Sequence, residues 1–302
     1  MTINKSKQII HHAVTITKPR WLTFVMRWKD ADRVFLLRAY EQGGFEAYKF
    51  VELLDQEGIG SIQEVGKILG VAQGLSKSYS RPLAGSLDAP FWLEMAQGKY
   101  AENGRKFARC VGRFLKEKPG KPGAFFWRQV WNMMNACAFF NRASCGSFAE
   151  YLKRKLADAC GRTTVSDAEF LNVPSDTWRL FVEKGKPYKD ILGVGENVFD
   201  FLMGDFDDAR FSRDCFKFDA SNSHFLKVTG ISDLIAPFDR DHTIAFIRSL
   251  DLPYTLREVN RGIYAYSSET EAKHYGFCRS SAKCAVCRVK TLCNKRLLRN
   301  EN

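Results

Sequence analysis

Residues 125–140 are apolar on nearly every side when they are drawn as a helix. A helix without a polar face cannot lie on a surface with one side in water, so this segment must be buried at the centre of a helical domain. The apolar residues that impose this are Trp127, Val130, Trp131, Met133, Met134, Cys137, Phe139 and Phe140.

Helical periodicity also marks the segments on both sides of residues 125–140, and strand-like alternation is nearly absent. The pattern therefore predicts an all-α fold. The further predicted helices cover residues 32–40, 44–55, 62–69, 101–115, 147–159, 175–183, 187–192, 196–203 and 220–228.

The clearest boundary in the chain is residues 117–124, where proline and glycine alternate with charge and no regular element can persist. A chain of 302 residues is also too long for one small core. We therefore predict a helical N-terminal extension over residues 1–118 and a second domain over residues 119–302.

The formal charge of +12 suits a polyanionic partner, either nucleic acid or an anionic membrane surface. No run of about 18 apolar residues is present, so we expect no membrane-spanning segment. The first residues are polar and do not form an apolar signal core. We therefore expect a cytoplasmic, nucleoid-associated protein whose cysteines are thiols or metal ligands and not disulfides.

Four of the nine cysteines lie within sixteen residues, in the pattern Cys278-x5-Cys284-x2-Cys287-x5-Cys293. Four thiolates at compact spacing can hold a [4Fe–4S] cluster within one loop. Taken alone, the spacing fits a tetrahedral zinc site equally well. The scattered cysteines are expected to be small buried apolar residues; they are Cys110, Cys137, Cys145, Cys160 and Cys215.

Residues 187–203 have the pattern of two short helices joined by a tight turn. Pro187 suits the first turn of a helix, and Gly193 and Gly195 flank Val194 where side chains would crowd the backbone. The exposed N–H groups of such a turn, and of the helix that follows it, form a site for a phosphate. A hairpin of this kind grips the DNA backbone without reading sequence, although an ordinary turn between helices has the same pattern.

Asp219 ends the short apolar segment 215–219 and precedes an amphipathic helix. An aspartate there can act simply as an N-cap, because its carboxylate accepts hydrogen bonds from helix N–H groups. Asp214 is the rival candidate for a functional carboxylate, but no helix follows it. The polar loop between the hairpin and these residues contains Asp205, Asp207 and Asp208, which we expect to be solvated.

A Leu-Gly-Val-Gly hairpin, a downstream aspartate that begins a helix, and a terminal four-cysteine loop occur here in this order. Over about residues 125–298 the chain resembles the endonuclease III/MutY branch of the helix-hairpin-helix (HhH-GPD) DNA glycosylases. The resemblance implies a fold of two lobes, one with the hairpin and one with an iron–sulfur cluster, that clamp double-stranded DNA. It favours [4Fe–4S] over zinc for Cys278, Cys284, Cys287 and Cys293.

The resemblance also implies that Asp219 is the catalytic aspartate and that Gly193, Val194, Gly195 and Asn197 contact DNA. Breaking an N-glycosidic bond builds positive charge on the sugar, which a fixed carboxylate stabilises while it orients or deprotonates water. The target nucleotide must be flipped out of the duplex to reach it.

Asn197 stands where bifunctional members of the family carry a lysine that attacks the sugar. An amide cannot act as an amine nucleophile. We therefore predict a monofunctional, monomeric DNA N-glycosylase without AP-lyase activity, in which water attacks and an abasic site remains.

The chain departs from the family at two further places. The interval from Gly195 to Asp219 is longer than usual, and residues 135–140 replace the glutamine that fills the gap in the duplex. The excised base is therefore left open: it is damaged, mispaired or hypermodified, as in phage DNA. The alternatives are a non-catalytic iron–sulfur or zinc protein of the same fold that binds DNA, and a zinc-stabilised interaction protein.

Overall fold

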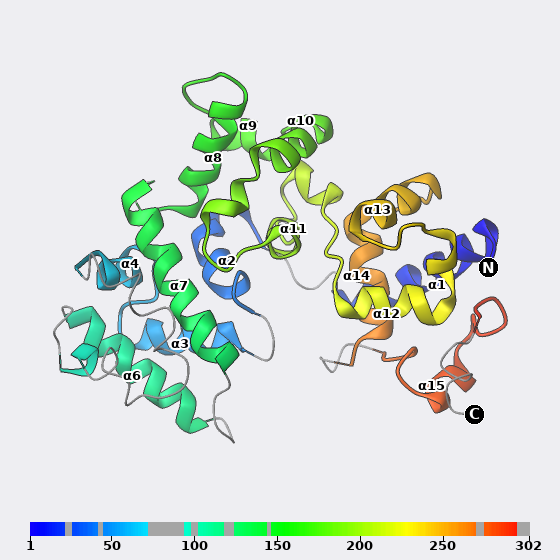
Figure 1. Cartoon of the computed structure of the whole chain (residues 1–302), viewed down its shortest axis with the longest axis horizontal. Helices are drawn as coiled ribbons and strands as arrows, with labels where there is room; N and C mark the ends of the chain where they lie inside the picture. The colour runs from blue at the N-terminus through cyan, green and yellow to red at the C-terminus, as the bar shows by residue number, and fades with distance from the viewer. Residues whose placement is uncertain are drawn as a thin grey trace. The chain divides into compact units, whose positions relative to one another are not determined.

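The computed structural model describes residues 1–21, 26–41, 45–71, 94–97, 102–117, 124–143, 146–269 and 275–294 (Figure 1). These residues are predominantly helical, and no strand occurs among them. One isolated bridge pairs Met26 with Phe206. The predicted all-α class is therefore confirmed. No helix in the described ranges is both long and apolar enough to cross a membrane.

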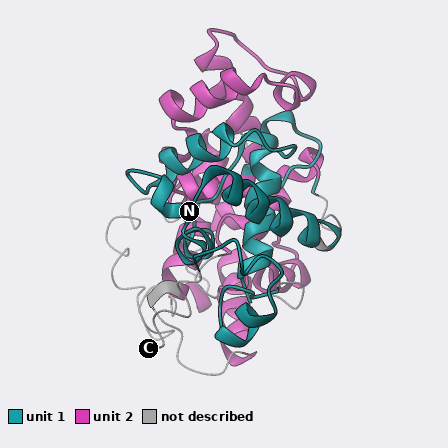
Figure 2. Ribbon diagram, turned by 90° about the vertical axis from the view of Figure 1, so that its right-hand side faces the viewer, with its two compact units in different colours: residues 1–26, 203–302 teal, residues 27–202 magenta. Residues whose placement is uncertain are grey.

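The chain folds as two compact units (Figure 2). Unit 1 comprises Met1–Met26 and Met203–Asn302, and unit 2 comprises Arg27–Leu202. This division by contacts differs from the division at residues 118 and 119 expected from the sequence, because the first 26 residues join the last hundred. The predicted linker lies mostly at residues 118–123, outside the described residues.

Unit 2 is built around α7 (Ala124–Ala143), the helix that the sequence predicts to be buried. Phe140 of α7 packs against Phe35 and Phe148, with ring centroids 5.1 and 5.7 Å away. The other helices of this unit are α2 (Ala31–Arg38), α3 (Ala47–Gln56), α4 (Ile62–Val71), α6 (Glu102–Glu117), α8 (Phe148–Ala159), α9 (Asp167–Leu171), α10 (Ser175–Leu180) and most of α11 (Glu196–Met203).

Unit 1 joins the two ends of the chain. Helix α1 (Ile3–Trp21) packs along α14 (Leu256–Ser267), and Gly262 allows the close approach because a Cβ there would lie 2.7 Å from Val14 Cγ2. The remaining helices of unit 1 are the 3-10 segments η4 (Arg210–Asp214) and η5 (Ile231–Leu234) together with α12 (Ala220–Thr229), α13 (Arg240–Ser249) and α15 (Ser281–Val286).

The interior of unit 1 contains polar as well as apolar side chains. Arg257 of α14 is only 6% exposed and forms an ion pair with Asp205, which is 5% exposed. The expectation that Asp205 is solvated is therefore wrong. Arg261 also reaches Asp205, at 3.4 Å, and pairs with the more exposed Asp207 at 3.1 Å.

Candidate functional site

The glycine hairpin lies in unit 2, between the 3-10 segment η3 (Pro187–Asp190) and α11. Gly193 has φ +82°, in the left-handed region that glycine tolerates best. A Cβ on Gly193 would lie 2.3 Å from Asn132 Nδ2 of α7. Gly193 is therefore required both by its backbone conformation and by the close packing of the turn on α7.

Two tyrosine hydroxyls hold the first arm of the hairpin. The Tyr151 hydroxyl lies 2.8 Å from the carbonyl oxygen of Pro187 and 2.9 Å from Asp190 Oδ2. Tyr40 donates a hydrogen bond of 3.0 Å to the carbonyl of Leu192. These contacts fix the segment immediately before Gly193.

The tip of the hairpin presents backbone to solvent. Val194 is 5% exposed and anchors the turn in the core, whereas Gly193 and Gly195 on either side of it are exposed. No atom lies within 4 Å of a Cβ built on Gly195, whose φ is not positive. The packing of this chain therefore gives no reason for a glycine at position 195. Asn197 lies partly buried in the first turn of α11.

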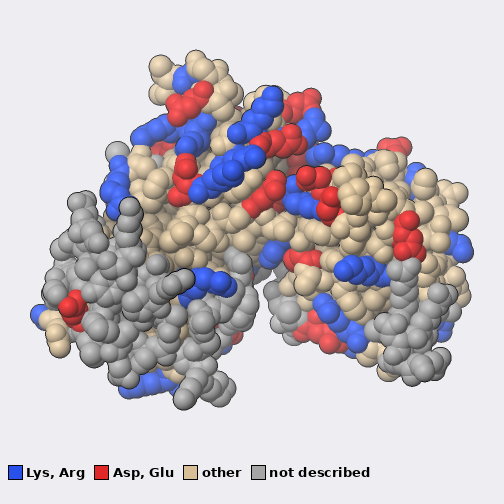
Figure 3. Space-filling model, viewed as in Figure 1, with Lys and Arg blue, Asp and Glu red and all other residues tan. Residues whose placement is uncertain are grey.

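Basic side chains are exposed beside the hairpin at Lys184, Lys186 and Lys189. On the face shown in Figure 3, Lys and Arg lie among Asp and Glu over the described surface. The described residues on that face thus carry both signs of charge, and a site for phosphate depends on local geometry more than on one broad basic patch.

Asp219 is the N-cap of α12, as predicted, and lies in unit 1. Its Oδ1 accepts a hydrogen bond of 2.8 Å from the backbone N–H of Asn222. Burial raises the pKa of the Asp219 carboxyl above its usual value, against the opposing effects of the helix N–H groups and of the charges on Lys217 and Arg279. A carboxylate that is partly desolvated and fixed at a helix start is a stronger base than a free aspartate.

The rival carboxylate has a different environment. Asp214 lies at the end of η4, and its Oδ1 is 3.7 Å from Arg248 Nη2. The residue after it, Cys215, has extended backbone, so no helix begins there. Of the two, Asp219 alone stands at a helix N-terminus.

The four clustered cysteines gather at the edge of the unit 1 core. Cys278, Cys284 and Cys287 are 6–7% exposed, and Cys293 is partly buried. Burial raises the pKa of the Cys278 thiol, and the three other thiols raise it further, so all four lie within electrostatic range. The Tyr266 hydroxyl lies 2.8 Å from Cys287 Sγ.

The chemistry of these donors fits an iron–sulfur cluster or zinc, both of which are bound by thiolates. In the described parts of the chain, however, no three His, Cys, Asp or Glu side chains are arranged so that they could hold a metal ion as they stand. The residue types therefore fit an iron–sulfur cluster or zinc, whereas the four sulfur atoms are not close enough together, as they stand, to bind either one.

The segment that carries the cysteines is tied to the helix that Asp219 caps. His224 donates from Nε2 to the carbonyl of Cys278, and Arg279 donates from Nη2 to Ser221 Oγ at 2.9 Å. At the other end of α12, the N–H of Asn294 donates to the carbonyl of Thr229 at 2.8 Å. This docking was not expected from the sequence. Arg279 and Asn294 each follow a cysteine directly, and this adjacency is the signal that could have indicated it.

One expectation about the other cysteines needs correction. Cys110, Cys137 and Cys215 are buried as expected, but Cys160 is exposed; Cys145 lies outside the described residues. Residues 135–140 lie within α7 and are largely buried, as the apolar pattern of this segment predicts.

Comparison of the chain with protein-family models, with curated proteins and with solved structures found no match.

We expect Asp219→Asn to stabilise the protein at neutral pH. Asparagine caps a helix about as well as aspartate, and it removes a carboxyl whose pKa is raised by burial. Such a carboxyl favours the fold while it is protonated, and that contribution is lost as the pH rises through the folded pKa. Asp219→Asn should therefore have a larger free energy of unfolding than the wild type at neutral pH. This difference should vanish at pH values below the ordinary carboxyl pKa of about 3.9.

Asp239 offers a matched control with the opposite sign. It caps α13, and hydrogen bonds from the backbone and side chain of His242 lower its pKa. A carboxyl with a lowered pKa stabilises the fold at pH values above the usual carboxyl pKa, and this stabilisation is lost as the pH falls through the folded pKa. Asp239→Asn should therefore be less stable than the wild type at neutral pH. Urea unfolding of the three proteins at neutral and acid pH measures both signs, and a wild type more stable than Asp219→Asn at neutral pH would contradict our assignment.

Proposed function

We propose that this protein is a monofunctional DNA N-glycosylase that flips a base out of double-stranded DNA and removes it by hydrolysis. The observation that carries the proposal is Asp219, a partly desolvated carboxylate held by the first turn of α12. A simple capping role explains the hydrogen bond of Asp219, but a cap does not benefit from a raised pKa. A general base that activates water does benefit, because a higher pKa makes the carboxylate a better proton acceptor.

The proposed reaction breaks the bond between C1′ of the sugar and the base nitrogen. The electron pair leaves with the base, which takes up a proton from the solvent, and the sugar becomes positively charged. The ionised carboxylate of Asp219 stabilises this charge. Water then adds to C1′ and gives its proton to Asp219, which passes it to the solvent. The product is DNA with an abasic site. Asn197 has no amine, so we expect no Schiff base and no cleavage of the strand.

The hairpin is the proposed site for a DNA phosphate. Gly193 and Gly195 are exposed, α11 begins directly after the turn, and the first N–H groups of a helix have no partners within the helix. Such groups favour a bound anion. The turn is held in place by Tyr40 and Tyr151, so it need not be ordered when DNA binds.

The division of the chain into two units is compatible with the two lobes that the family resemblance implies. The hairpin belongs to unit 2, and Asp219 and the four cysteines belong to unit 1. We propose that Cys278, Cys284, Cys287 and Cys293 hold a [4Fe–4S] cluster, with zinc as the alternative. The bound group would fix the segment that is docked on α12 and would supply no step of the reaction. We further propose that the protein acts as a monomer in the cytoplasm, on chromosomal or phage DNA.

Substitution of the two hairpin glycines should separate folding from DNA binding. Gly195→Ala should fold like the wild type, because its Cβ would meet no atom of this chain, yet it should bind DNA more weakly because a methyl group blocks the approach of a phosphate. Gly193→Ala should lose stability by roughly 1–3 kcal/mol through backbone strain and contact with Asn132. Thermal unfolding and fluorescence anisotropy with duplex DNA measure the two effects. Unchanged DNA affinity in Gly195→Ala would exclude the hairpin as a phosphate site.

Asp219→Asn should abolish base release while duplex DNA binds as tightly as before, or more tightly. The amide keeps the cap but can neither stabilise the charged sugar nor accept a proton. Mass spectrometry of free bases released from bacterial, oxidised and phage DNA measures the activity and identifies the substrate. Asp239→Asn, which changes an exposed cap in the same unit, is the matched control and should remain active.

Treatment with borohydride during the reaction should trap no covalent adduct of protein and DNA. An adduct abolished by one lysine substitution would refute the monofunctional mechanism. If the wild type binds these DNAs but releases no base from any of them, we replace the glycosylase proposal by its alternative, a non-catalytic DNA-binding protein. The presence of Asn197 in place of the lysine of bifunctional members of the family is in line with that alternative.

The purified protein should be brown, with broad visible absorption and about four iron atoms per chain. Cys284→Ser should lose most of the iron, because one thiolate ligand is removed. Cys160→Ser is the matched control, since Cys160 is exposed and lies outside the cluster of cysteines. A colourless protein with about one zinc per chain would replace the iron–sulfur assignment by zinc.

A further inference from the structure

The carbonyl oxygen of Lys217, two residues before Asp219, accepts three hydrogen bonds. The backbone N–H of Asp219 donates one, at 3.1 Å. The side-chain amides of Asn222 and Asn260 donate the others from Nδ2, at 2.8 and 2.9 Å. The N–H of Lys217 in turn donates to Oδ1 of Asn260, at 3.3 Å. Both polar groups of the Lys217 backbone are thus held by side chains that are almost completely buried.

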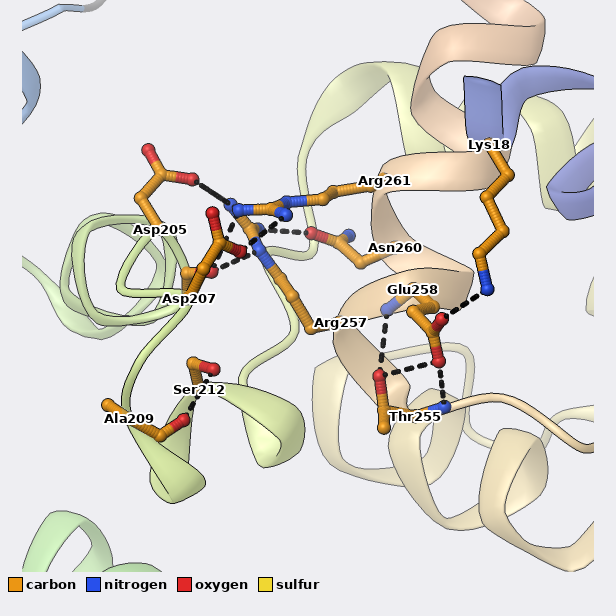
Figure 4. A network of polar contacts seen from close by, with 11 residues as sticks. Lys18, Asp205, Asp207, Ala209, Ser212, Thr255, Arg257, Glu258, Asn260 and Arg261 are labelled. Atoms are coloured by element: carbon orange, nitrogen blue, oxygen red, sulfur yellow. Dashed lines mark hydrogen bonds and ion pairs between the residues drawn. The ribbon is translucent and has the colours of Figure 1, made fainter. Parts of the chain in front are cut away.

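Asn260 has one orientation in this network. Its Oδ1 faces two donors, the N–H of Lys217 and Nη1 of Arg257 at 3.0 Å, so Nδ2 must face the carbonyl of Lys217. Arg257 is itself fixed by its ion pair with Asp205 and by a bond of 2.8 Å from Nε to the carbonyl of Gly204. Figure 4 shows Arg257, Asn260 and Arg261 directed from α14 toward Asp205 and Asp207.

We propose that Asn260 is a positioning residue for Asp219, acting through the carbonyl oxygen of Lys217. The inference rests on the proposed function and adds to it the residue that sets where the carboxylate stands. Asn260 comes from α14 and Asp219 from the start of α12, so the contact fixes two helices relative to each other at this point. Because the reacting groups of an enzyme must be held in a narrow geometry, a displacement of about 1 Å can lower the rate by about 10²-fold.

The chemistry of the position supports this role over simple packing. Asn260 is 3% exposed and lies on α14, whose buried residues also include Val259 and Ile263. A buried amide is unfavourable unless it is fully hydrogen-bonded, and an aliphatic side chain would fill the same space. Here each polar atom of the Asn260 side chain has a partner, and the chain of contacts ends at the N–H of Asp219.

The test is Asn260→Leu, which keeps the number and branching of the side-chain heavy atoms and removes the three hydrogen bonds made by this side chain. Release of the base should slow on the order of 10²-fold in kcat, with KM and the affinity for duplex DNA close to those of the wild type. NMR titration of the Asp219 carboxyl should move its pKa toward the usual value as the carboxyl gains solvent, with Lys217 and Arg279 remaining the charged groups around it.

Val259→Ala is the matched control. It removes buried volume from the neighbouring position of α14, whose side chain has no polar atom and therefore makes no hydrogen bond to the Lys217 backbone. It should destabilise the protein while leaving kcat and the pKa of Asp219 unchanged. If Asn260→Leu does not fold, Asn260→Asp serves. It keeps the acceptor for the N–H of Lys217 and for Arg257, but it replaces the donor to the Lys217 carbonyl with a second carboxyl oxygen, which repels that carbonyl. Its kcat should also fall, on the order of 10²-fold.

The outcomes separate the inference from the function on which it rests. If the wild type releases a base and the Asn260 variants match Val259→Ala in kcat and in the pKa of Asp219, the positioning role is overturned and the glycosylase stands. If the wild type releases no base while Asp219 titrates as expected, the proposed function fails. The inference that Asn260 positions Asp219 for catalysis then fails with it.

Discussion

Helix α14 is enclosed by α1, α12 and η4, and nine of its twelve residues are buried. A helix enclosed in this way has to find partners inside the protein for its polar side chains, because water cannot reach them. Among its side chains, Arg257 meets Asp205, Asn260 meets the backbone of Lys217, and Tyr266 meets Cys287. The backbone carbonyl of Ser267 also accepts from Nε of Arg279. The polar groups of one buried helix therefore contact both Lys217, two residues before Asp219, and the segment that carries the four clustered cysteines.

The ion pair of Arg257 and Asp205 illustrates how strongly this interior depends on matched partners. Burial lowers the pKa of the Arg257 guanidinium, and the charge of Asp205 opposes that effect. Removing one member of such a pair typically costs about 3–5 kcal/mol, since the other charge is left without a partner in a medium of low dielectric constant. An apolar pair of equal volume could be as stable. What the charges add is a fixed direction for the side chains around them, including the amide of Asn260.

Much of unit 2 could be predicted from the sequence because its helices carry strong patterns. The uniformly apolar residues of α7 and the glycines of the hairpin need little context, and Asp219 begins a helix as its pattern predicts. The helices α1, α9, α13, α14 and α15 were not predicted. In α14 the inward-facing Arg257 and Asn260 interrupt the apolar period, and their partners come from distant segments. Asp205 was misjudged for the same reason, since a loop aspartate gives no sign of a buried arginine 52 residues away.

The close packing of α1 on α14 has a consequence for the order in which the protein can form. Helix α1 is made before unit 2, but its buried face has its partners in the part of unit 1 that follows Leu202; this face consists of Ile9, Ile10, Ala13 and Val14. Ribosomes add about 5–20 residues per second. During synthesis that apolar face therefore stays uncovered for on the order of ten seconds or more, while the continuous segment of unit 2 can already fold. A nascent chain of this kind offers a chaperone a binding site on the uncovered face of α1.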